Sequence, residues 1–379
     1  MSKPQYPHLR STSTLRLAGI PLAAAVSLGA AGCEAARDYD AKPVLDDVVH
    51  IVILPTLSDA SARAAELDAA AEAVSSDPTA ESLGAAQDAW RSARAPWRSS
   101  DAFAFGPVET DGLGAAIDWW PAKPDTIEEK IAAGGAIDAA YIESLGTSAK
   151  GFMALEYLLF DSTNGDDAVL ASLTGDPAAA RRAYVAAVAE SLAGKVGTLH
   201  AAWAEDQGNY AQELLLAGDG SKVFVSQKSA VDELVNQMVF QADNVLNKIG
   251  KPAGKSNGGV PVPDAEESPR SDNSLADMLA TLDGIQSVYD GARGDKDGMG
   301  VSDLVRARNA DVDDRVHDAF ADARAKIEAI PPPFRAAVTD HVAEVDAAYE
   351  AARTLKRTLA TEVVSVLGST LRFNDADGD

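Results

Sequence analysis

The sequence predicts an all-α protein, and three observations support this fold class. Alanine recurs in nearly every segment of the 379-residue chain, and alanine favours the helix more than any other residue. Runs of β-branched residues with strict alternation, which would indicate strands, are scarce. Hydrophobic residues make up 46% of the chain and charged residues 24%, so the composition is globular, and the length suits two domains.

In the N-terminal half, the first long helix is expected within residues 45–76, where Pro55 should kink or interrupt it. Asp77 and Pro78 then resemble an N-cap followed by a proline at the first helical position. The helix that begins there is expected to continue through two tryptophans. Further helices are expected at Thr126–Ala133, Thr147–Phe160 and Asp176–Glu205.

In the C-terminal half, residues 250–274 are rich in Gly, Pro and Ser. We interpret them as a long loop rather than an interdomain linker, because the periodic helix before them must pack somewhere. Two aspartate-rich turns, "GDKDGMG" and the C-terminal "FNDADGD", lack the full spacing of a calcium loop and are interpreted as solvated. The helices expected in this half are Gln227–Ile249, Asn273–Tyr289, Val312–Ala329 and Pro333–Leu367.

The N-terminus has the layout of a secretory signal. Lys3, Arg10 and Arg16 precede an apolar stretch that is too short for a comfortable membrane span. Residues 1–32 are therefore expected to be a lipoprotein signal peptide.

Cys33, the only cysteine, ends the sequence "LGAAGC", which resembles a bacterial lipobox. Lipid on Cys33 would anchor the protein to a membrane, with residues 33–42 as a tether. The alternative is an ordinary signal peptide with a stray cysteine. Glu34 stands where an aspartate usually retains a lipoprotein in the inner membrane, which favours the periplasmic face of the outer membrane. A single cysteine also excludes an intramolecular disulfide.

Charge and motifs exclude several function classes. The net charge of -25 argues against nucleic acid as a partner, since a phosphate backbone needs a basic footprint. The sequence contains no HExxH, CxxC, P-loop or GxSxG motif, and no two histidines lie within four residues of each other. His50 lies in an apolar stretch and is expected to be a satisfied core histidine. No active site is evident from these motifs.

Glu156 is the one carboxylate in the apolar run "GFMALEYLLF". A fully buried, unpaired glutamate is costly, so the fold should either compensate Glu156 or use it. In the structural alternative, an arginine, a tryptophan N–H or a loop amide satisfies it, and the first side chains to consider are Arg94, Arg98, Trp119 and Trp120. In the functional alternative, Glu156 lines a cleft and binds a ligand or cation, since buried carboxylates with shifted pKa values often mark sites. Both alternatives stay open from the residues alone.

Six segments along the chain carry a resemblance: "AWRSARAPWRSSDAFAFGPVE", "IDWWP", "GFMALEYLLF", "VDELVNQMVFQADNV", "ESPRSDNSLADMLATLDGIQSVYDG" and "VVSVLGSTLRFNDADGD". In this order they resemble the imelysin family of bacterial envelope proteins. The resemblance implies two helical-bundle lobes related by duplication, residues 43–219 and 220–379, with a site near their interface. The family was named for an insulin-cleaving peptidase, and related proteins belong to iron-uptake systems.

The family's marker motif, GxHxxE, places a histidine and a glutamate on one helix face, where they can converge on a transition metal. This chain keeps Gly151 and Glu156 but has Met153 at the histidine position. A thioether is a weak ligand for Zn(II) or Fe(III), so the metal site is expected to be lost or weakened, with Met153 used for packing and Glu156 as the remaining metal-site residue. Any cofactor would be iron or another transition metal. The resemblance and the composition of the loops add Glu109, Asp118, Glu267, Ser268 and Asn273 to the candidate ligand-binding residues.

Three functions follow from the resemblance. The first is an exported, lipid-anchored binding protein that helps acquire iron or an iron-bearing ligand, with envelope iron-uptake proteins as partners. The second is a metallopeptidase, which is disfavoured because a hydrolytic zinc site needs about three protein ligands. The third is an envelope interaction scaffold without a metal.

Overall fold

Helices make up the regular structure in the computed structural model, which describes residues 40–175 and 178–372. These residues contain no strand, only one isolated antiparallel bridge between Arg293 and Lys296. The predicted all-α class is confirmed. The predicted signal peptide, Cys33 and the C-terminal acidic turn lie outside the described residues. Among the helices within those ranges, none is long and apolar enough to cross a membrane.

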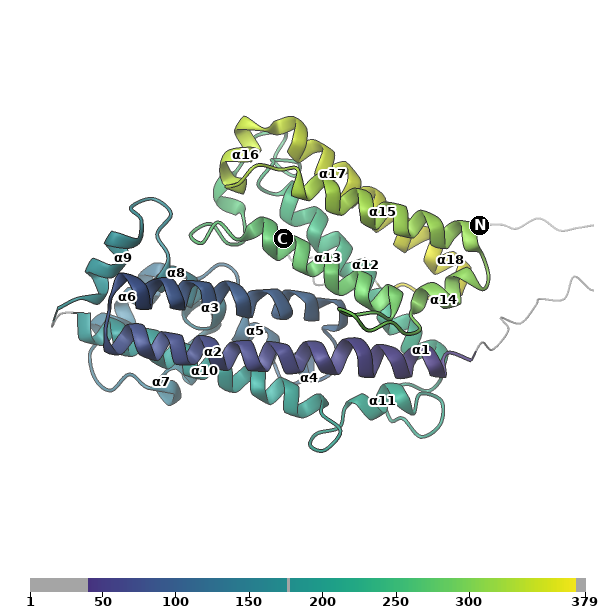
Figure 1. Ribbon diagram of the computed structural model, residues 1–379, viewed down its shortest axis with the longest axis horizontal. Helices are drawn as coiled ribbons and strands as arrows, with labels where there is room; N and C mark the ends of the chain where they lie inside the picture. Colours follow the sequence, from purple (N-terminus) through teal and green to yellow (C-terminus); the bar gives the residue numbers. More distant parts are fainter. Residues whose placement is uncertain (1–39, 176–177, 373–379) are drawn as a thin grey trace, which may run out of the picture. The chain divides into compact units, whose positions relative to one another are not determined.

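Three long helices dominate the first half, where α2 packs along both α3 and α10 (Figure 1). Their facing apolar side chains, including Leu67, Trp90 and Val188, are fully buried. Shorter elements surround this group. The elements of this half are α1 (Lys42–Asp47), η1 (Val48–Ile53), α2 (Leu54–Ser76), α3 (Ala80–Ser99), η2 (Ser100–Phe103), α4 (Pro107–Thr110), α5 (Leu113–Ile117), α6 (Pro124–Ala132), α7 (Ala139–Glu143), η3 (Thr147–Ala149), α8 (Gly151–Leu159), α9 (Asp166–Leu173), α10 (Ala179–Trp203) and α11 (Ala211–Leu215).

The second half contains another group of long helices, in which α12 and α15 each pack against α13 and α17. Met238, Ile285 and Phe320 are among its buried side chains. Residues 251–273 join α12 to α13 with only one short helical turn, so the predicted long loop is confirmed. The elements of this half are α12 (Gln227–Gly250), η5 (Pro263–Ala265), α13 (Ser274–Asp290), α14 (Val301–Arg306), α15 (Ala310–Glu328), α16 (Phe334–Asp340), α17 (Val342–Arg357), η6 (Thr358–Val363) and α18 (Val364–Leu367).

Side-chain caps fix where long helices begin. The Thr79 hydroxyl accepts a hydrogen bond from the Ser82 backbone N–H, and the Ser82 hydroxyl accepts one from Thr79 N–H. This reciprocal capping box starts α3, and the same arrangement starts α12. The predicted cap at Asp77 and Pro78 is therefore wrong by two residues.

Three predicted helices change conformation along their length. The helix around Pro55 has a π-helical turn, η1, just before the proline, in agreement with the predicted interruption. The helix expected at Thr147–Phe160 breaks at Lys150, whose backbone is extended. The helix expected at Pro333–Leu367 breaks at His341, between α16 and α17.

The two groups of helices meet where α13 crosses the end of α3. A Cβ atom on Gly284 of α13 would lie 2.0 Å from the carbonyl oxygen of Ser99, so only glycine permits this approach. The Ser99 hydroxyl also donates to a backbone carbonyl of α13 at 3.0 Å. The division into lobes 43–219 and 220–379 stays a prediction, since the described residues belong to one compact unit.

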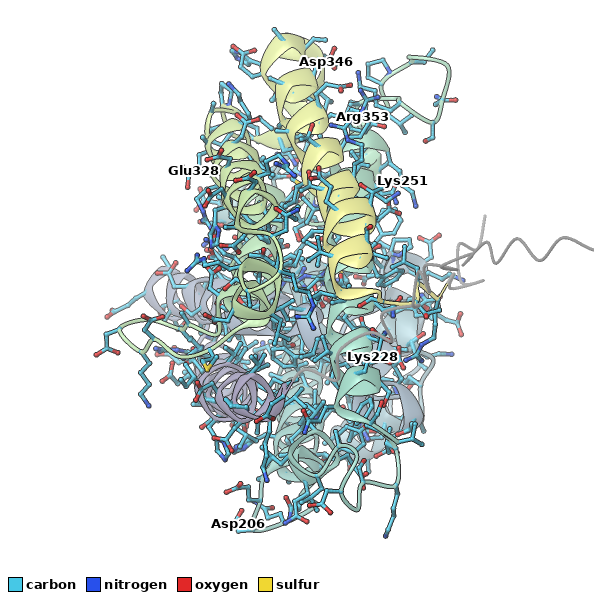
Figure 2. All side chains as sticks on the ribbon, turned by 90° about the vertical axis from the view of Figure 1, so that its right-hand side faces the viewer. Asp206, Lys228, Lys251, Glu328, Asp346 and Arg353 are labelled. Atoms are coloured by element: carbon cyan, nitrogen blue, oxygen red, sulfur yellow. The ribbon has the colours of Figure 1, made fainter. Side chains whose placement is uncertain are left out.

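Charged side chains project from the outer faces of the helices, as the acidic, polar composition predicts. Many of them form ion pairs that are exposed to solvent, such as Arg353 with Glu350 on α17. Exposed pairs of this kind contribute at most about 1 kcal/mol to stability. Figure 2 shows this arrangement and labels Asp206, Lys228, Lys251, Glu328, Asp346 and Arg353.

His50 is not the core histidine that the apolar sequence around it predicts. Its side chain is 40% exposed, and its ring nitrogens lie 2.8 Å from the Asp46 carbonyl oxygen and 3.2 Å from Glu205 Oε1. The prediction fails because the face of η1 that carries His50 points away from the core. The acceptors around the ring raise the pKa of His50 against the lowering effect of burial.

Gly284→Ala is expected to destabilise the protein by about 1–3 kcal/mol, because the added methyl group overlaps the Ser99 backbone. Chemical denaturation of both proteins measures the change. Gly194→Ala, on an open part of α10, is the matched control and should stabilise by about 0.5–1 kcal/mol. Equal effects of the two substitutions would contradict a close crossing of α3 and α13.

Candidate functional site

Gly151 fixes the start of α8 against the loop that carries Asp118. Its φ is +74°, in the left-handed region, and a Cβ atom would lie 2.2 Å from the Ile117 carbonyl oxygen. Glycine is needed here both for the backbone angle and for the close approach. The glycine of the motif is therefore explained by packing, and it places Met153 and Glu156 in the interior.

Glu156 is compensated by the backbone of a distant loop. Its side chain is almost fully buried, and Oε1 accepts hydrogen bonds from the Arg270 N–H at 3.0 Å, the Ser271 N–H at 3.0 Å and the Ser271 hydroxyl at 2.9 Å. Burial raises the pKa of Glu156, and these hydrogen bonds oppose the rise. Glu156 thus ties α8 to the loop before α13.

Of the three kinds of donor expected for Glu156, the loop amide is the one that the structure shows. The four named side chains are not its partners: Arg94 and Arg98 bind other carboxylates, and Trp119 and Trp120 are 47% and 40% exposed. The sequence could not say which loop supplies the amides, because backbone N–H groups have no sequence signature.

A second buried glutamate lies in the same loop. Neither carboxylate oxygen of Glu266 has a hydrogen bond of good geometry among the described residues, and Nη1 of Arg335 is 3.9 Å away. Burial raises the pKa of Glu266 to about 7. The Ser274 hydroxyl and the charge of Arg335 oppose this rise, whereas the charges of Asp272 and Glu156 add to it.

Arg94 is the centre of a buried group of charges. Its guanidinium is fully buried and forms two hydrogen bonds with Asp277, at 3.2 and 2.9 Å, and one with Asp118 Oδ2 at 2.7 Å. Asp277 also accepts hydrogen bonds from Ser268 and Asn273. Burial alone lowers the pKa of Arg94, but the surrounding carboxylates raise it well above its ordinary value. This geometry keeps the side chain charged.

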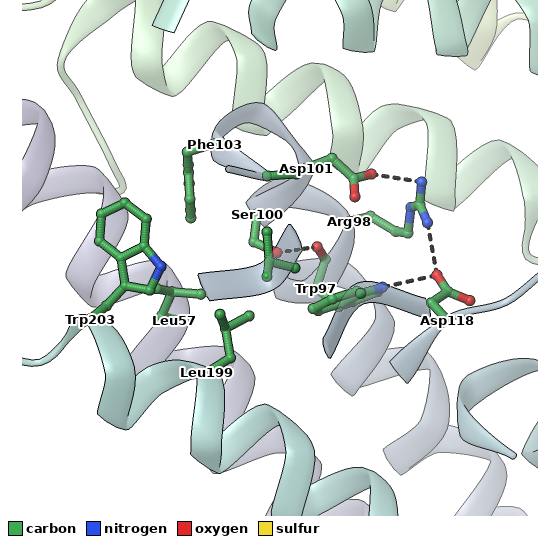
Figure 3. Close-up of a pocket in the computed structure, with 12 residues that line it drawn as sticks. Leu57, Trp97, Arg98, Ser100, Asp101, Phe103, Asp118, Leu199 and Trp203 are labelled. Atoms are coloured by element: carbon green, nitrogen blue, oxygen red, sulfur yellow. Dashed lines mark hydrogen bonds and ion pairs between the residues drawn. The ribbon is translucent and has the colours of Figure 1, made fainter. Parts of the chain in front are cut away.

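Arg98 extends this arrangement toward the end of α3. It pairs with Asp101 at 2.6 Å, Asp118 at 2.8 Å and Glu267 at 3.2 Å, and Figure 3 shows it between Asp101 and Asp118. Lys248 Nζ lies 2.8 Å from the other oxygen of Glu267. Burial raises the pKa of Glu267, but the three neighbouring cations lower it overall, far below its usual range. We call the whole set the charge cluster: Arg94, Arg98, Asp101, Asp118, Lys248, Glu267 and Asp277.

A polar pocket of about 570 Å³ lies beside Glu156, and we call it the Glu156 pocket. Met153, Glu156 and Glu267, which the sequence analysis selected, all line it. Its other lining residues come from α8, α9, α10 and α16, from the loops after α5 and α8, and from the loop before α13. Those that carry a charge or an aromatic ring are Trp120, Tyr157, Phe160, Asp161, Arg181, Asp264, Arg270 and Arg335.

The structure gathers most of the predicted site residues into two adjoining places. Asp118, Ser268 and Asn273 surround Arg94 and Asp277, and Glu267 belongs to both the charge cluster and the pocket. Gly151 packs against the Ile117 carbonyl group and is not among the residues that line the pocket.

Glu109 is placed differently. It is exposed on α4, where burial and its neighbour Glu233 raise its pKa. It is not among the residues that line the Glu156 pocket.

Sequence reasoning missed Asp277, Arg270, Ser271 and Arg335. One signal was available: Asn273 and Asp277 lie four residues apart, on one face of a predicted helix that starts beside Ser268. The roles of Arg270 and Ser271 depend on a contact across 115 residues of sequence, which no local pattern reveals.

The residues around Glu156 do not fit a transition metal held by the protein itself. Across the described ranges, no group of three His, Cys, Asp or Glu side chains converges in a metal-binding arrangement. Glu156 Oε1 already accepts three hydrogen bonds, and Met153 is 2% exposed. Met153 is thus buried in the interior, and Oε1 of Glu156 holds the loop.

Fold and site together define an all-helical bundle protein with a charge cluster beside a polar pocket. The sequence matches the profile of the Imelysin family over residues 53–360. The chain belongs to the imelysin family.

Individual relatives agree with this assignment. Iron-regulated protein A of Synechococcus elongatus is 30% identical over 321 residues, which cover 82% of this chain and 83% of that protein. The crystal structure of an iron-regulated protein A precursor from Parabacteroides distasonis is similar, with a TM-score of 0.74, 24% identity, and coverage of 86% of this chain and 94% of that one. For an imelysin-like protein from Psychrobacter arcticum the TM-score is 0.69, with 19% identity and coverage of 88% and 96%. The two structures establish the shared fold.

Arg94→Ala is expected to lower the free energy of unfolding by about 3–5 kcal/mol, because it leaves Asp118 and Asp277 buried without their main partner. Urea denaturation measures the loss. Arg353→Ala removes an exposed arginine from a surface pair and should change stability by no more than about 0.5 kcal/mol. A loss of less than about 1 kcal/mol for Arg94→Ala would show that the charge cluster contributes little.

Glu266 is expected to make stability depend on pH. Its folded pKa of about 7 exceeds the ordinary value of 4.5, so the folded chain binds more protons between these two values. The stabilisation associated with neutral Glu266 is complete below pH 4.5 and is lost as the pH rises through about 7. Glu266→Gln, which stays neutral, should therefore match the wild type near pH 5 and exceed it near pH 8 by on the order of 2 kcal/mol.

Denaturation at both pH values measures this difference, with Glu328→Gln on the exposed end of α15 as the control. A constant difference between Glu266→Gln and wild type across the range would mean that Glu266 does not titrate there.

Proposed function

We propose that this protein is an exported binding protein of bacterial iron acquisition, and that it binds an anionic iron-bearing chelate in the Glu156 pocket. The observation that carries the proposal is a set of three arginines, Arg181, Arg270 and Arg335, on the wall of one polar pocket. In this proposal the bound chelate coordinates the iron, so the protein itself need not supply metal-coordinating side chains.

Arg270 is the arginine best placed to meet a ligand. No ion pair among the described residues includes it, whereas Arg181 pairs with Glu128 and Arg335 with Asp272. The Arg270 guanidinium lies 5.2 Å from the centre of the Tyr157 ring. Stacking on an aromatic face orients the planar guanidinium and leaves its N–H groups available to carboxylate or similar oxygens.

Three of the four carboxylates that line the pocket already have partners. Glu156 and Asp161 already accept hydrogen bonds from neighbouring N–H groups, and Glu267 is paired within the charge cluster. The hydrogen bonds from Asn164 and Thr163 lower the pKa of Asp161, so it stays ionised with its oxygens occupied by these donors. The fourth, Asp264, has no side-chain partner among the described residues. Arg270 is therefore the cation on which attraction of a negatively charged ligand depends.

The relatives support the connection with iron. The names of the Synechococcus and Parabacteroides proteins describe them as iron-regulated. A polar pocket with an available arginine suits a whole chelate better than a bare ion.

We further propose export and a lipid anchor on Cys33, with the helical body on the periplasmic face of the outer membrane. The signal layout and the lipobox-like "LGAAGC" support this location. Partners would then be envelope iron-uptake proteins that deliver or receive the ligand. A peptidase is less well supported, because the donor set that a hydrolytic zinc ion needs is not assembled in the described part of the chain.

Arg270→Ala is expected to weaken binding of ferric citrate about tenfold or more, since one charge-assisted hydrogen bond contributes about 1.5–3 kcal/mol. Calorimetric titration of the purified protein measures the dissociation constant, and Trp120 on the pocket wall gives a fluorescence signal. Lys255→Ala is the matched control: it removes another cation that lies over a tyrosine ring, outside the pocket, and should leave the affinity unchanged.

Titrations with Fe(II), Cu(II) and haem separate the alternatives. Failure of ferric citrate and haem to bind would overturn the proposal. Binding of Fe(II) alone that is lost in Glu156→Gln would favour a metal site of the family type instead.

A further inference from the structure

A second, smaller pocket lies among α2, α3, η2 and α10 and is walled by aromatic rings. Its volume is about 170 Å³, close to that of a cavity of about 150 Å³ that holds one benzene molecule. Trp97, Phe103 and Trp203 form its aromatic walls, with Leu57 and Leu199 beside them. We call it the aromatic pocket. Figure 3 shows these apolar side chains together with Arg98, Asp101 and Asp118, which lie at one end.

The charge cluster at that end lacks one positive charge. Its carboxylates are Asp101, Asp118, Glu267 and Asp277, and its cations are Arg94, Arg98 and Lys248, so four negative charges face three positive ones. All seven side chains are largely buried. An uncompensated charge in such surroundings is costly, so a further cation at this place is favourable.

Two of these carboxylates have an oxygen without a donor. Both interactions of Asp101, with Arg98 and Thr281, fall on Oδ2. Asp118 receives three donors on Oδ2, while its buried Oδ1 has no hydrogen-bond partner among the described residues. Asp101 and Asp118 both line the aromatic pocket. Burial raises the pKa of Asp101 although Arg98 opposes the rise, as expected where negative charge is in excess.

We propose that the aromatic pocket is a binding site for a small organic ammonium ion, with its apolar body between the aromatic walls and its cationic group toward Asp101 and Asp118. Aromatic faces attract cations, and they contact apolar groups as well. A sodium or potassium ion is a poorer match, because hard cations need several oxygen ligands and most of these walls are carbon. This site is separate from the Glu156 pocket.

The test uses the purified protein with three probes: benzylammonium, its neutral analogue benzyl alcohol, and potassium chloride. Calorimetry should show one saturable site for benzylammonium, binding of benzyl alcohol at least tenfold weaker, and no heat from potassium at the same concentration. Benzylammonium should also raise the midpoint of thermal unfolding. Equal affinity for the ammonium and the alcohol, or no binding of benzylammonium, would overturn the proposal.

Two variants test whether benzylammonium binds in the aromatic pocket. Asp101→Asn balances the charge cluster and should weaken benzylammonium at least tenfold, whereas Asp283→Asn, on the exposed side of α13, should not. Leu199→Phe fills the pocket and should abolish binding while circular dichroism remains helical. If a proton rather than a ligand supplies the missing charge, Asp101→Asn raises the unfolding midpoint and benzylammonium does not bind the wild type, which rejects the site.

Discussion

The buried guanidinium of Arg94 organises the centre of this protein. Removing such a charge from water costs several kcal/mol, and only well-placed carboxylates offset that cost. Asp118 follows α5 and Asp277 belongs to α13, so both chain segments must reach α3 for Arg94 to be tolerated. One side chain thereby fixes a loop of the first half and a helix of the second. In some proteins, buried ion pairs of this kind contribute more to a unique arrangement than to net stability, and we infer the same role here.

The Glu156 pocket depends on a second buried charge. Glu156 holds the backbone at Arg270 and Ser271, and that segment carries the arginine side chain that faces the pocket. The wall of the pocket is therefore shaped by a carboxylate that itself lines it. The loop can be irregular in backbone and still ordered, because its N–H groups have a buried acceptor.

The sequence predicted the helices well and the site in part. Periodicity located most of the long helices because apolar spacing is a local property. The resemblance selected Asp118, Glu267, Ser268 and Asn273, which do surround Arg94. The sequence does not predict which of these charged and polar side chains pair, because the pairs depend on which helices cross in the fold. The sequence analysis also missed the break before α8. The need for glycine at position 151 comes from its close approach to the Ile117 carbonyl group, which is distant in sequence.

The hydrogen bonds of Glu156 bear on how this chain could have come to carry methionine at position 153. If a bound metal compensated the buried charge of this carboxylate, loss of the neighbouring histidine would weaken metal binding and leave that charge without a partner. Here three N–H and O–H donors satisfy Glu156 whatever occupies the third position of the motif. The carboxylate therefore keeps its donors whether position 153 holds methionine or the histidine of the family motif.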